Sequence, residues 1–431
     1  MRFEELNLHP KVLEQIKILG YDEPTEVQEK GIPEILGGRD VVAQSETGSG
    51  KTAAFVIPIA GKVERGRGVQ VLVLTPTREL CIQVAETFKD YGKPLQLHVA
   101  TIYGGVSINP QIESLNRSEI VVATPGRLLD HMNRGLNLGS IRFLILDEVD
   151  KMFEMGFIDD VERIISNAPR NRQTLLFSAT ISTKIHELVR KHLHTPILIK
   201  TKPLVDKTKL KQTFYDVPQN MKFSLLVHLL KNKGSGLALI FCGTRRQADV
   251  ITQNLKQNGI KAMAIHGGLT QNKREYALES LRKEQVNILV ATDVAARGLD
   301  IKNVTHVYNY DSPKTSEEYI HRIGRTARAG EKGEAITLLS QRDYEDFGNV
   351  RRDHSLEIQK LEVPQVERVA FISGERGGSY GGRSTSRFGP GSRQGFHGRS
   401  SGSRSGYSSG QGSPSRGKHR RNESYRTPKF G

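Results

Sequence analysis

Near its N-terminus the chain reads Asp40-Val-Val-Ala-Gln-Ser-Glu-Thr-Gly-Ser-Gly-Lys-Thr52, an apolar run that opens into a loop of small residues and leads into an apolar helical stretch, 53–60. Strand, glycine-rich loop and helix in this order are typical of a phosphate-binding loop. Backbone N–H groups can wrap phosphates there, and the helix N-terminus adds its positive dipole. We expect Lys51 to reach the β- and γ-phosphates and the Thr52 hydroxyl to bind Mg²⁺. The strict pattern has Gly where this chain has Ser45, so a flexible loop is the alternative.

Short β-rich runs alternate with helical stretches after this loop. Apolar runs occur at 40–43, 69–74, 120–123, 143–146 and 174–177, then at 237–241, 262–265, 286–290 and 304–308, with helical stretches such as 245–257 and 271–282. Near-continuous apolar runs are typical of parallel strands buried between two layers of helices. The alternation lapses at a polar segment and then restarts, which predicts two α/β domains, 1–200 and 211–365, joined by a linker, 201–210.

The C-terminal segment, 366–431, differs sharply in composition. From Gly374 on, twelve Lys or Arg stand against two Glu, and fifteen Gly and thirteen Ser leave almost no aliphatic residues. Such a segment cannot offset its ordering entropy by burial, so we predict disorder. It carries +10 of the chain's net charge of +16, and six aromatics are scattered through it. These features favour non-specific, salt-sensitive binding of a polyanion over a merely solubilising role.

Composition also excludes several classes of protein. The two cysteines, Cys81 and Cys242, show neither metal-ligand spacing nor a pairing motif, which indicates buried thiols in a reducing compartment. No run of about 18 apolar residues predicts a membrane span, and the first residues do not resemble a secretory signal. We therefore expect a cytoplasmic protein without a membrane partner, and the charge points to a polyanion as its partner.

Two carboxylates follow the apolar strand 143–146 directly. Asp147 and Glu148 are expected at the carboxyl end of a parallel strand, which faces the same crevice as the phosphate loop. Asp147 would hold Mg²⁺ through its water shell, and Glu148 would be the general base that orients the attacking water. An exposed acidic turn is the alternative for this pair taken alone.

A cluster of basic residues lies in the second predicted domain, in the segment His321-Arg-Ile-Gly-Arg-Thr-Ala-Arg328. Cations that meet the charge developing on the γ-phosphate accelerate phosphoryl transfer. An arginine on a separate domain can act in this way only when the domains close, so hydrolysis would depend on closure. By spacing alone, a solvated basic helix face is the simpler interpretation.

Taken together and in order, the motifs resemble those of the DEAD-box branch of superfamily 2 helicases, over about residues 3–340. Residues 20–28, with Phe3 upstream, are similar to the Q motif of that family. The other resemblances lie at 43–52 (motif I), 76–80 (Ia), 104–105 (the GG doublet), 124–127 (Ib), 147–150 (II), 178–180 (III), 241–244 (IV), 271–274 (QxxR), 291–300 (V) and 321–328 (VI). One such match can arise by chance, but eleven in the right order cannot plausibly do so.

The resemblance implies two RecA-like parallel-sheet domains in tandem plus the disordered basic C-terminal tail, with ATP and Mg²⁺ as cofactors. ATP binding is implied for Phe3, Tyr21, Gln28, Ser45, Glu46, Thr47, Gly48, Ser49, Gly50, Lys51, Thr52 and Asp300, and metal binding for Thr52 and Asp147. The implied catalytic residues are Lys51, Glu148, Arg325 and Arg328. Sequence-independent contacts to the RNA backbone are implied for Arg78, Gly105, Thr124, Arg127, Thr244, Arg274 and Thr292, and coupling of hydrolysis to strand opening for Asp150, Ser178, Thr180 and His321.

Three residues depart from the family pattern. Val149 stands where motif II has Ala; it removes no catalytic group, but a β-branched residue can shift packing near motif III. Ala327 replaces the usual Gly of motif VI. It would strain the loop if that position needs a positive φ and would be harmless in a helix. Glu46 adds a negative charge to the phosphate loop, where we expect it to point to solvent.

The resulting hypothesis is an ATP-dependent RNA helicase, in which RNA-stimulated ATP hydrolysis drives local unwinding or remodelling of RNA duplexes and RNA–protein complexes. Backbone and 2′-OH contacts would favour RNA over DNA. A DNA helicase or translocase is one alternative, against which the Q motif and motifs Ia and III argue. An ATP-dependent RNA clamp is another, which sequence alone does not separate from a helicase. We expect a monomer and leave protein partners in RNA metabolism open.

Overall fold

The computed structural model of the chain describes residues 1–46, 48–201, 209–232, 234, 236–296, 301, 303–327 and 331–372. Three predicted site residues, Thr47, Asp300 and Arg328, lie outside these ranges. Most of the predicted linker and the tail from Ser373 on lie outside them as well. What was predicted for these residues stays a prediction.

The first sheet has seven strands, all parallel, in the order β3-β4-β2-β5-β6-β1-β7. The strands are β1 (Val41–Gln44), β2 (Val71–Leu74), β3 (Val99–Ile102), β4 (Ile120–Ala123), β5 (Phe143–Leu146), β6 (Gln173–Ser178) and β7 (Ile197–Lys200). The helices are α1 (Pro10–Ile18), α2 (Glu26–Leu36), α3 (Lys51–Ala60), α4 (Arg78–Gly92), α5 (Asn109–Leu115), α6 (Pro125–Met132), α7 (Val149–Glu154), α8 (Ile158–Ser166) and α9 (Thr183–His192), with short 3-10 turns at Phe3–Leu6 and Lys93–Leu95.

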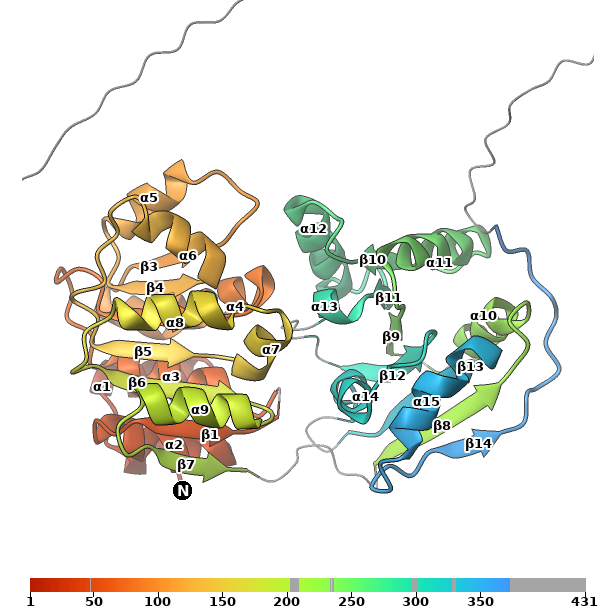
Figure 1. Cartoon of the computed structure of the whole chain (residues 1–431), viewed down its shortest axis with the longest axis horizontal. Helices are drawn as coiled ribbons and strands as arrows, with labels where there is room; N and C mark the ends of the chain where they lie inside the picture. Colours follow the sequence, from red (N-terminus) through yellow and green to blue (C-terminus); the bar gives the residue numbers. More distant parts are fainter. Residues whose placement is uncertain are drawn as a thin grey trace, which may run out of the picture. The chain divides into compact units, whose positions relative to one another are not determined.

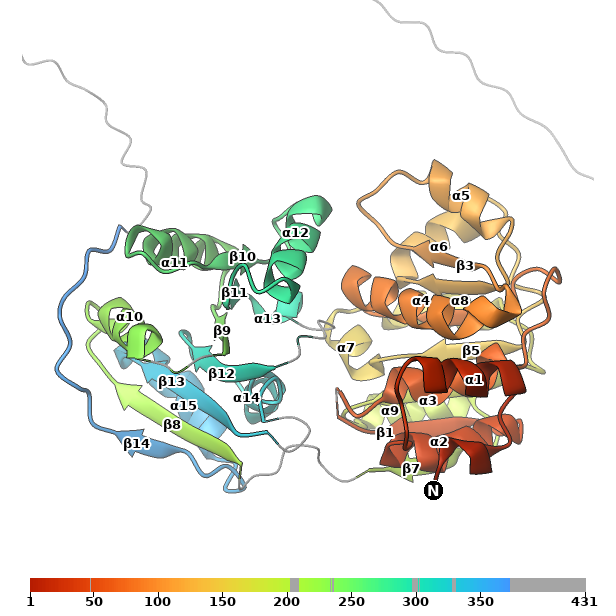
Figure 2. The ribbon, with the colours of Figure 1, turned by 180° about the vertical axis from the view of Figure 1, so that it is seen from behind.

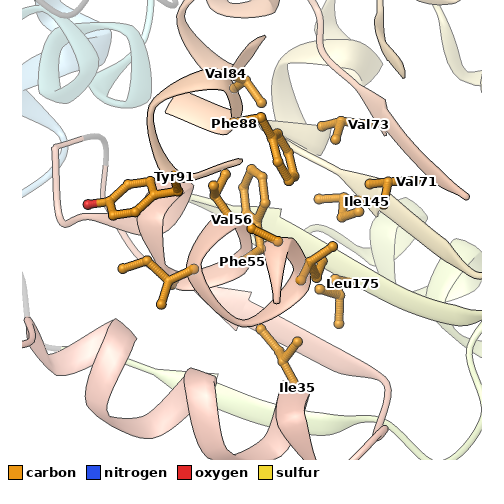
Figure 3. Close-up of a cluster of buried hydrophobic side chains, with 14 of the residues drawn as sticks. Ile35, Phe55, Val56, Val71, Val73, Val84, Phe88, Tyr91, Ile145 and Leu175 are labelled. Atoms are coloured by element: carbon orange, nitrogen blue, oxygen red, sulfur yellow. The ribbon is translucent and has the colours of Figure 1, made fainter. Parts of the chain in front are cut away.

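Helices cover both faces of this sheet, α6, α8 and α9 on the face toward the viewer in Figure 1 and α1 to α4 on the opposite one (Figure 2). Successive strand residues therefore enter two different cores: Val71 and Val73 pack with α3 and α4, whereas Leu72 and Leu74 pack with α6 and α8. Figure 3 shows the first core, where Phe55 of α3 packs in a cluster that includes Val71 and Val73. This packing fixes the start of α3, and with it the phosphate loop, against the sheet.

The second sheet also has seven parallel strands, in the order β10-β11-β9-β12-β13-β8-β14. The strands are β8 (Leu210–Asp216), β9 (Leu237–Phe241), β10 (Met263–Ile265), β11 (Ile288–Ala291), β12 (Val304–Asn309), β13 (Gly333–Leu339) and β14 (Gln359–Leu361). The helices are α10 (Lys222–Asn232), α11 (Arg245–Gln257), α12 (Gln271–Arg282), α13 (Asp293–Ala296), α14 (Ser316–Ile323) and α15 (Tyr344–Arg351), with a 3-10 turn at Gln341–Asp343. Its core on one face is built with α10 and α11, and on the other with α12 to α15.

Residues 362–372, which follow β14 and which we call the strap, contact the second domain. Phe371 packs its ring against Phe223 of α10, with ring centroids 4.9 Å apart. Asn254 of α11 accepts a hydrogen bond from the backbone N–H of Ile372 (2.7 Å) and donates one to its carbonyl (3.0 Å). Figures 1 and 2 show the strap in blue, running from β14 toward α11. The tail is predicted to begin at residue 366, but five of its first seven residues contact the second domain: Val366, Val369, Ala370, Phe371 and Ile372.

Both cysteines are buried, each in one domain. Burial raises the pKa of the Cys81 thiol to about 12, and it raises that of Cys242 well above its usual value. Neither thiol is therefore reactive at neutral pH in the folded protein. Among the described residues, no helix combines the length and the apolar character needed to cross a membrane.

Candidate active site

The phosphate loop connects β1 to α3 and is closed by its own side chains. Gly48 and Gly50 both have φ of 91°, a left-handed conformation that glycine adopts without strain. Lys51, the first residue of α3, is buried and donates a 2.6 Å hydrogen bond from Nζ to the Ser45 carbonyl. Ser45 also donates from Oγ to Ser49 (2.6 Å). The predicted strand, loop and helix are thus present, with the lysine ammonium held inside the loop.

Gln28 ties the Q-motif segment to this loop. It forms a capping box at the start of α2, where its Oε1 accepts from the Thr25 backbone N–H (3.0 Å). Its Nε2 donates to the carbonyl of Gly50 (3.1 Å). A Cβ at Gly50 would overlap both side chains. One side chain therefore bonds both the start of α2 and the phosphate loop.

The two aromatic side chains predicted near the base differ in accessibility. Phe3 is only 3% exposed and belongs to the core that α1, α2 and α3 share. Tyr21 is 53% exposed. Stacking on a ligand requires an open ring face, so these exposures favour Tyr21 for that role and give Phe3 a packing role. Sequence spacing could not separate the two, because burial is decided by tertiary contacts.

The carboxylates after β5 lie where predicted. Asp147 is buried, and its Oδ1 accepts a hydrogen bond from the Glu148 backbone N–H (3.0 Å). Burial raises the pKa of Asp147 to about 7, although the nearby charge of Lys51 opposes this. Glu148 has a left-handed backbone, with φ of 52°. A buried carboxylate next to the phosphate loop is a fitting ligand for a cation, and a strained glutamate is typical of a functional site.

Motifs II and III are joined by hydrogen bonds. Asp150 Oδ2 accepts from the backbone N–H groups of Ala179 (3.0 Å) and Thr180 (2.9 Å) and from the Thr180 hydroxyl (3.3 Å). The Ser178 hydroxyl accepts from the Asp150 N–H (3.2 Å). Burial alone would raise the pKa of Asp150, but Lys151 and the Thr180 amide outweigh it and keep this carboxyl below its ordinary value. The end of β6 is therefore bonded to the start of α7.

The predicted RNA contacts of the first domain follow three neighbouring strands, β2, β3 and β4. Arg78 starts α4 after β2, Gly105 follows β3, and Thr124 precedes α6 after β4. Gly105 has φ of 82°, and a Cβ there would overlap the Arg78 guanidinium. Arg127 donates from both Nη atoms to the Val106 carbonyl (3.2 and 3.3 Å). The other half of the same edge, after β5, β6 and β1, holds most of the residues predicted to bind the nucleotide.

In the second domain, the predicted RNA contacts also follow three neighbouring strands. Thr244, Arg274 and Thr292 follow β9, β10 and β11, which occupy the same three places in the second sheet as β2, β3 and β4 in the first. The hydroxyl of Thr244 accepts from the Gln247 N–H (3.1 Å) and caps α11. His321 and Arg325 belong to the end of α14 and the turn after it, beyond β12. In both sheets, then, the same half of the carboxyl edge gathers the predicted RNA contacts.

Arg322 is a residue of motif VI whose partners sequence reasoning missed. It is buried and forms a two-pronged ion pair with Asp293, at 2.6 and 2.7 Å, while its Nη1 donates to the Asp311 carbonyl (2.7 Å). Its guanidinium lies over the Phe241 ring, 5.2 Å from the centroid. These contacts fix α14 against motif V, so Arg322 positions its neighbours. A pair 29 residues apart has no local sequence signal.

The three departures have different structural outcomes. Ala327 is buried with φ of 55°, so the position does need a positive φ and the strained-loop alternative is the correct one. Left-handed backbone costs a non-glycine residue about 1–2 kcal/mol. Val149 is buried in the same core as Met152 and Leu176 of β6. Glu46 is half-buried, and its carbonyl accepts from Ser49 Oγ (2.8 Å).

Comparisons with known proteins agree with this geometry. The sequence model of the DEAD/DEAH box helicase family matches residues 25–188, and that of the helicase conserved C-terminal domain matches 221–330. The chain is 43% identical to the ATP-dependent RNA helicase CshA of Listeria monocytogenes, over 84% of this chain and 71% of that protein. It is 42% identical to the DEAD-box ATP-dependent RNA helicase CshA of Geobacillus kaustophilus, over 85% and 79%. The structure of S. cerevisiae Dbp5 bound to RNA and ADP BeF3 matches with a TM-score of 0.76 at 30% identity, over 84% of this chain and 95% of that one.

The chain has two RecA-like parallel-sheet domains, with a phosphate loop in the first and helicase motifs along both sheet edges. These features define an ATP-hydrolysing motor that acts on nucleic acid. The sequence identity of 42–43% to the two CshA helicases, over most of their length, identifies the family within this class of motors. The chain belongs to the DEAD-box family of ATP-dependent RNA helicases, as its motifs predicted.

Proposed function

We propose that this helicase couples RNA-dependent ATP hydrolysis to local parting of base pairs, with each domain contributing half of the RNA site and part of the ATP site. The observation that supports this proposal is the arrangement of the predicted residues along the two sheet edges. The residues predicted to contact RNA follow the same three strand places in both sheets, apart from those predicted to bind the nucleotide. RNA-induced closure of the domains would then complete the catalytic site, so hydrolysis would depend on RNA.

In the nucleotide site, Lys51 leaves the Ser45 carbonyl for the β- and γ-phosphates, which the loop Ser45–Thr52 wraps with backbone N–H groups. Gln28 hydrogen-bonds the adenine edge, and Tyr21 stacks on its face in place of Phe3. Asp300 contacts the ribose. Because Gln28 already holds Gly50, recognition of adenine is transmitted to the phosphate loop.

Magnesium fits the residues beside this loop. Thr52 supplies a hydroxyl and Asp147 a buried carboxylate, and Mg²⁺ needs only one or two such protein ligands because it keeps several waters and binds phosphates. When bound, the ion would neutralise charge on the phosphates. Glu148 lies next to Asp147 and serves as the base that orients the attacking water. Arg325 and Arg328 stabilise the charge that develops on the γ-phosphate.

In the RNA site, the guanidinium groups, hydroxyls and backbone N–H groups of the seven predicted residues contact phosphates and 2′-OH groups. These are Arg78, Gly105, Thr124 and Arg127 of the first domain and Thr244, Arg274 and Thr292 of the second. Contacts to the backbone carry no base information, so recognition is independent of sequence. Asp150, Ser178, Thr180 and His321 couple the two sites, and the hydrogen bonds between motifs II and III support this role.

The remaining parts of the proposal concern the whole protein. The basic tail increases RNA affinity through arginine–phosphate contacts and aromatic stacking. We propose that the protein acts as a monomer in the cytoplasm, where buried thiols such as Cys81 and Cys242 stay reduced.

The test is ATP hydrolysis measured with no nucleic acid, with single-stranded or structured RNA, and with DNA of matched sequence. Wild type should be stimulated strongly by RNA alone. Lys51→Ala should abolish the activity, whereas Lys89→Ala, which removes an exposed lysine of α4, should leave it intact. Equal stimulation by DNA would contradict the RNA-specific proposal and indicate a general nucleic-acid translocase.

A further inference from the structure

The second domain contains a counterpart of the phosphate loop. The strand β8 occupies the place in the second sheet that β1 occupies in the first, and α10 follows it as α3 follows β1. Lys222 is the first residue of α10, as Lys51 is the first residue of α3. Ligands of open parallel sheets bind outside the carboxyl ends of such strands. The second edge therefore has the place for a nucleotide site.

This counterpart has lost the means to hold a triphosphate. The connecting residues 217–221 include no glycine, so they offer no close backbone approach to phosphates. The Lys222 side chain is 0% exposed, and its ammonium is 2.7 Å from Asp343 and 5.2 Å from the Tyr310 ring centroid. A lysine with such partners cannot reach a ligand. A second ATP site is therefore excluded on these grounds.

A pocket of about 310 Å³ lies beside this loop, close to the lower limit of small-molecule sites. Gln219 and Asn220 of the loop line it, together with Arg246 of α11 and Arg342 of the turn after β13. Phe371 of the strap, which is 44% exposed, forms one wall. Amides, guanidinium groups and an aromatic face are the groups that bind a base and its phosphate.

The same pocket is lined by Thr244, a proposed RNA contact at the N-terminus of α11. Asp311 bonds Arg342 (2.6 Å) and Gln247 (3.1 Å), both of which line the pocket. Arg342 also lies 3.9 Å from Asp343, whose charge Lys222 already balances. Arg246 and Arg342 together with Asp311 therefore leave a small net positive charge, too small to balance a free triphosphate. One phosphate and one base, as in a nucleotide of a strand, match it better.

We propose that this pocket binds one nucleotide of the RNA strand that Thr244 contacts, with its base on Phe371 and its phosphate near Arg246. The inference rests on the proposed contact of Thr244 with RNA and extends the bound stretch of the strand by one nucleotide. Base stacking on an aromatic side chain is sequence-tolerant, so the extra position would add affinity without adding sequence preference.

The experiment measures RNA affinity by fluorescence anisotropy in the presence of a non-hydrolysable ATP analogue, on uridine oligomers that carry one abasic site at each position in turn. Wild type should lose affinity about 5- to 150-fold when the abasic site falls at one particular position outside the core contacts. Phe371→Leu keeps apolar packing on Phe223 but removes the ring face, so at that position it should bind the abasic and the intact oligomer equally. Phe371→Tyr should restore the difference.

Charge is tested on the same oligomers. Arg246→Gln should weaken binding of the intact oligomer several-fold and reduce its salt dependence. Lys256→Gln, which removes an exposed cation from the other end of α11, should not lower affinity in this way.

Three outcomes would count against one of the two proposals. If no abasic position distinguishes wild type from Phe371→Leu while wild type binds RNA tightly, the pocket proposal is overturned and the helicase proposal stands. If wild type does not bind RNA at all, the proposed function itself fails. Binding of free UMP that depends on Phe371, without any abasic effect, would make the pocket a mononucleotide site and overturn the strand proposal.

Discussion

Gly105 shows how a missing side chain can serve a site. Its φ of 82° and its closeness to the Arg78 guanidinium both require glycine. We predict that Gly105→Ala displaces Arg78 and lowers RNA affinity about 10-fold, the loss expected for one charge-assisted contact. Affinity for ATP without RNA should not change. Anisotropy titrations with RNA and with a fluorescent ATP analogue measure the two effects.

The matched control for this prediction is Gly135→Ala. Gly135 has φ of 99°, and an added Cβ would meet nothing within 4 Å, so its substitution adds backbone strain without moving another side chain. If both variants lose RNA affinity equally, strain rather than Arg78 is responsible.

Ala327 allows a test of backbone strain in motif VI. Ala327→Gly removes about 1 kcal/mol of left-handed strain but gives up a buried methyl worth about 0.8 kcal/mol. We therefore expect its unfolding free energy to stay within about 1 kcal/mol of wild type. Ala327→Val should lose more than about 2 kcal/mol, because a β-branched residue tolerates φ of 55° poorly in a buried position. Urea unfolding measures both, and equal stability of the two variants would refute the strain interpretation.

Among the elements, the strands with apolar runs were the ones that sequence could predict. All nine predicted strands are present, as are the helices Arg245–Gln257 and Gln271–Arg282 with the predicted bounds. The pattern did not single out β3, β7, β8, β13 and β14. β3, β7 and β14 lie at the edges of the sheets and include partly exposed residues. β8 begins at Leu210, the last residue of the predicted linker, and the next three residues, 211–213, are polar. The pattern thus found most interior strands, but it missed β8 and β13, which are interior, and it found β10, which is an edge strand. The edge strands β3, β7 and β14 are defined by a neighbour far along the chain.

In the candidate site, too, only part of the arrangement could be predicted from the sequence. Motif residues could be placed because their spacing is local and their strand ends are predictable. The burial of Phe3 and the partners of Arg322 could not, because both follow from contacts between distant elements. The positive φ of Ala327 likewise depends on the turn that follows α14.

The start of α10 carries a buried ion pair whose strength can be measured. Lys222→Met removes the close cation of Asp343 and leaves it only the 3.9 Å contact with Arg342, and removing one partner of a buried pair costs about 3–5 kcal/mol. The double variant Lys222→Met/Asp343→Asn should cost clearly less than the sum of the single variants, because neither charge is then left alone. Strict additivity in urea unfolding would contradict the coupling.

The ion pair between Lys222 and Asp343 also predicts that the unfolding free energy depends on pH. Burial alone would raise the pKa of Asp343, but Lys222 and the Ser340 donors outweigh it and hold the pKa below its ordinary value. Its contribution to stability is therefore present above about pH 4 and is lost as the pH falls through the lowered pKa. The deficit of Asp343→Asn relative to wild type should shrink over that acidic range. A constant deficit would show that the carboxylate's charge is not what stabilises the fold.

At the scale of the whole molecule, the strap separates two kinds of truncation. Ending the chain after Ile372 should leave the unfolding free energy and the ATPase rate at saturating RNA unchanged, while the RNA concentration for half-maximal stimulation rises and becomes less salt-sensitive. Ending it after Pro364 should also destabilise the second domain, because Phe223 and Asn254 lose their partners. Thermal unfolding and RNA titrations distinguish the two. An unchanged RNA requirement after the first truncation would remove the proposed role of the tail.

The burial of Cys81 and Cys242 has a practical consequence for following this motor at work. Since neither thiol reacts at neutral pH, the native sequence already serves as an unreactive background for maleimide dyes. One cysteine at exposed Lys184 and another at exposed Gln253 would accept a donor and an acceptor fluorophore without removal of any natural residue from the cores. Single-molecule energy transfer between them would then report each opening and closing of the two domains as ATP and RNA come and go.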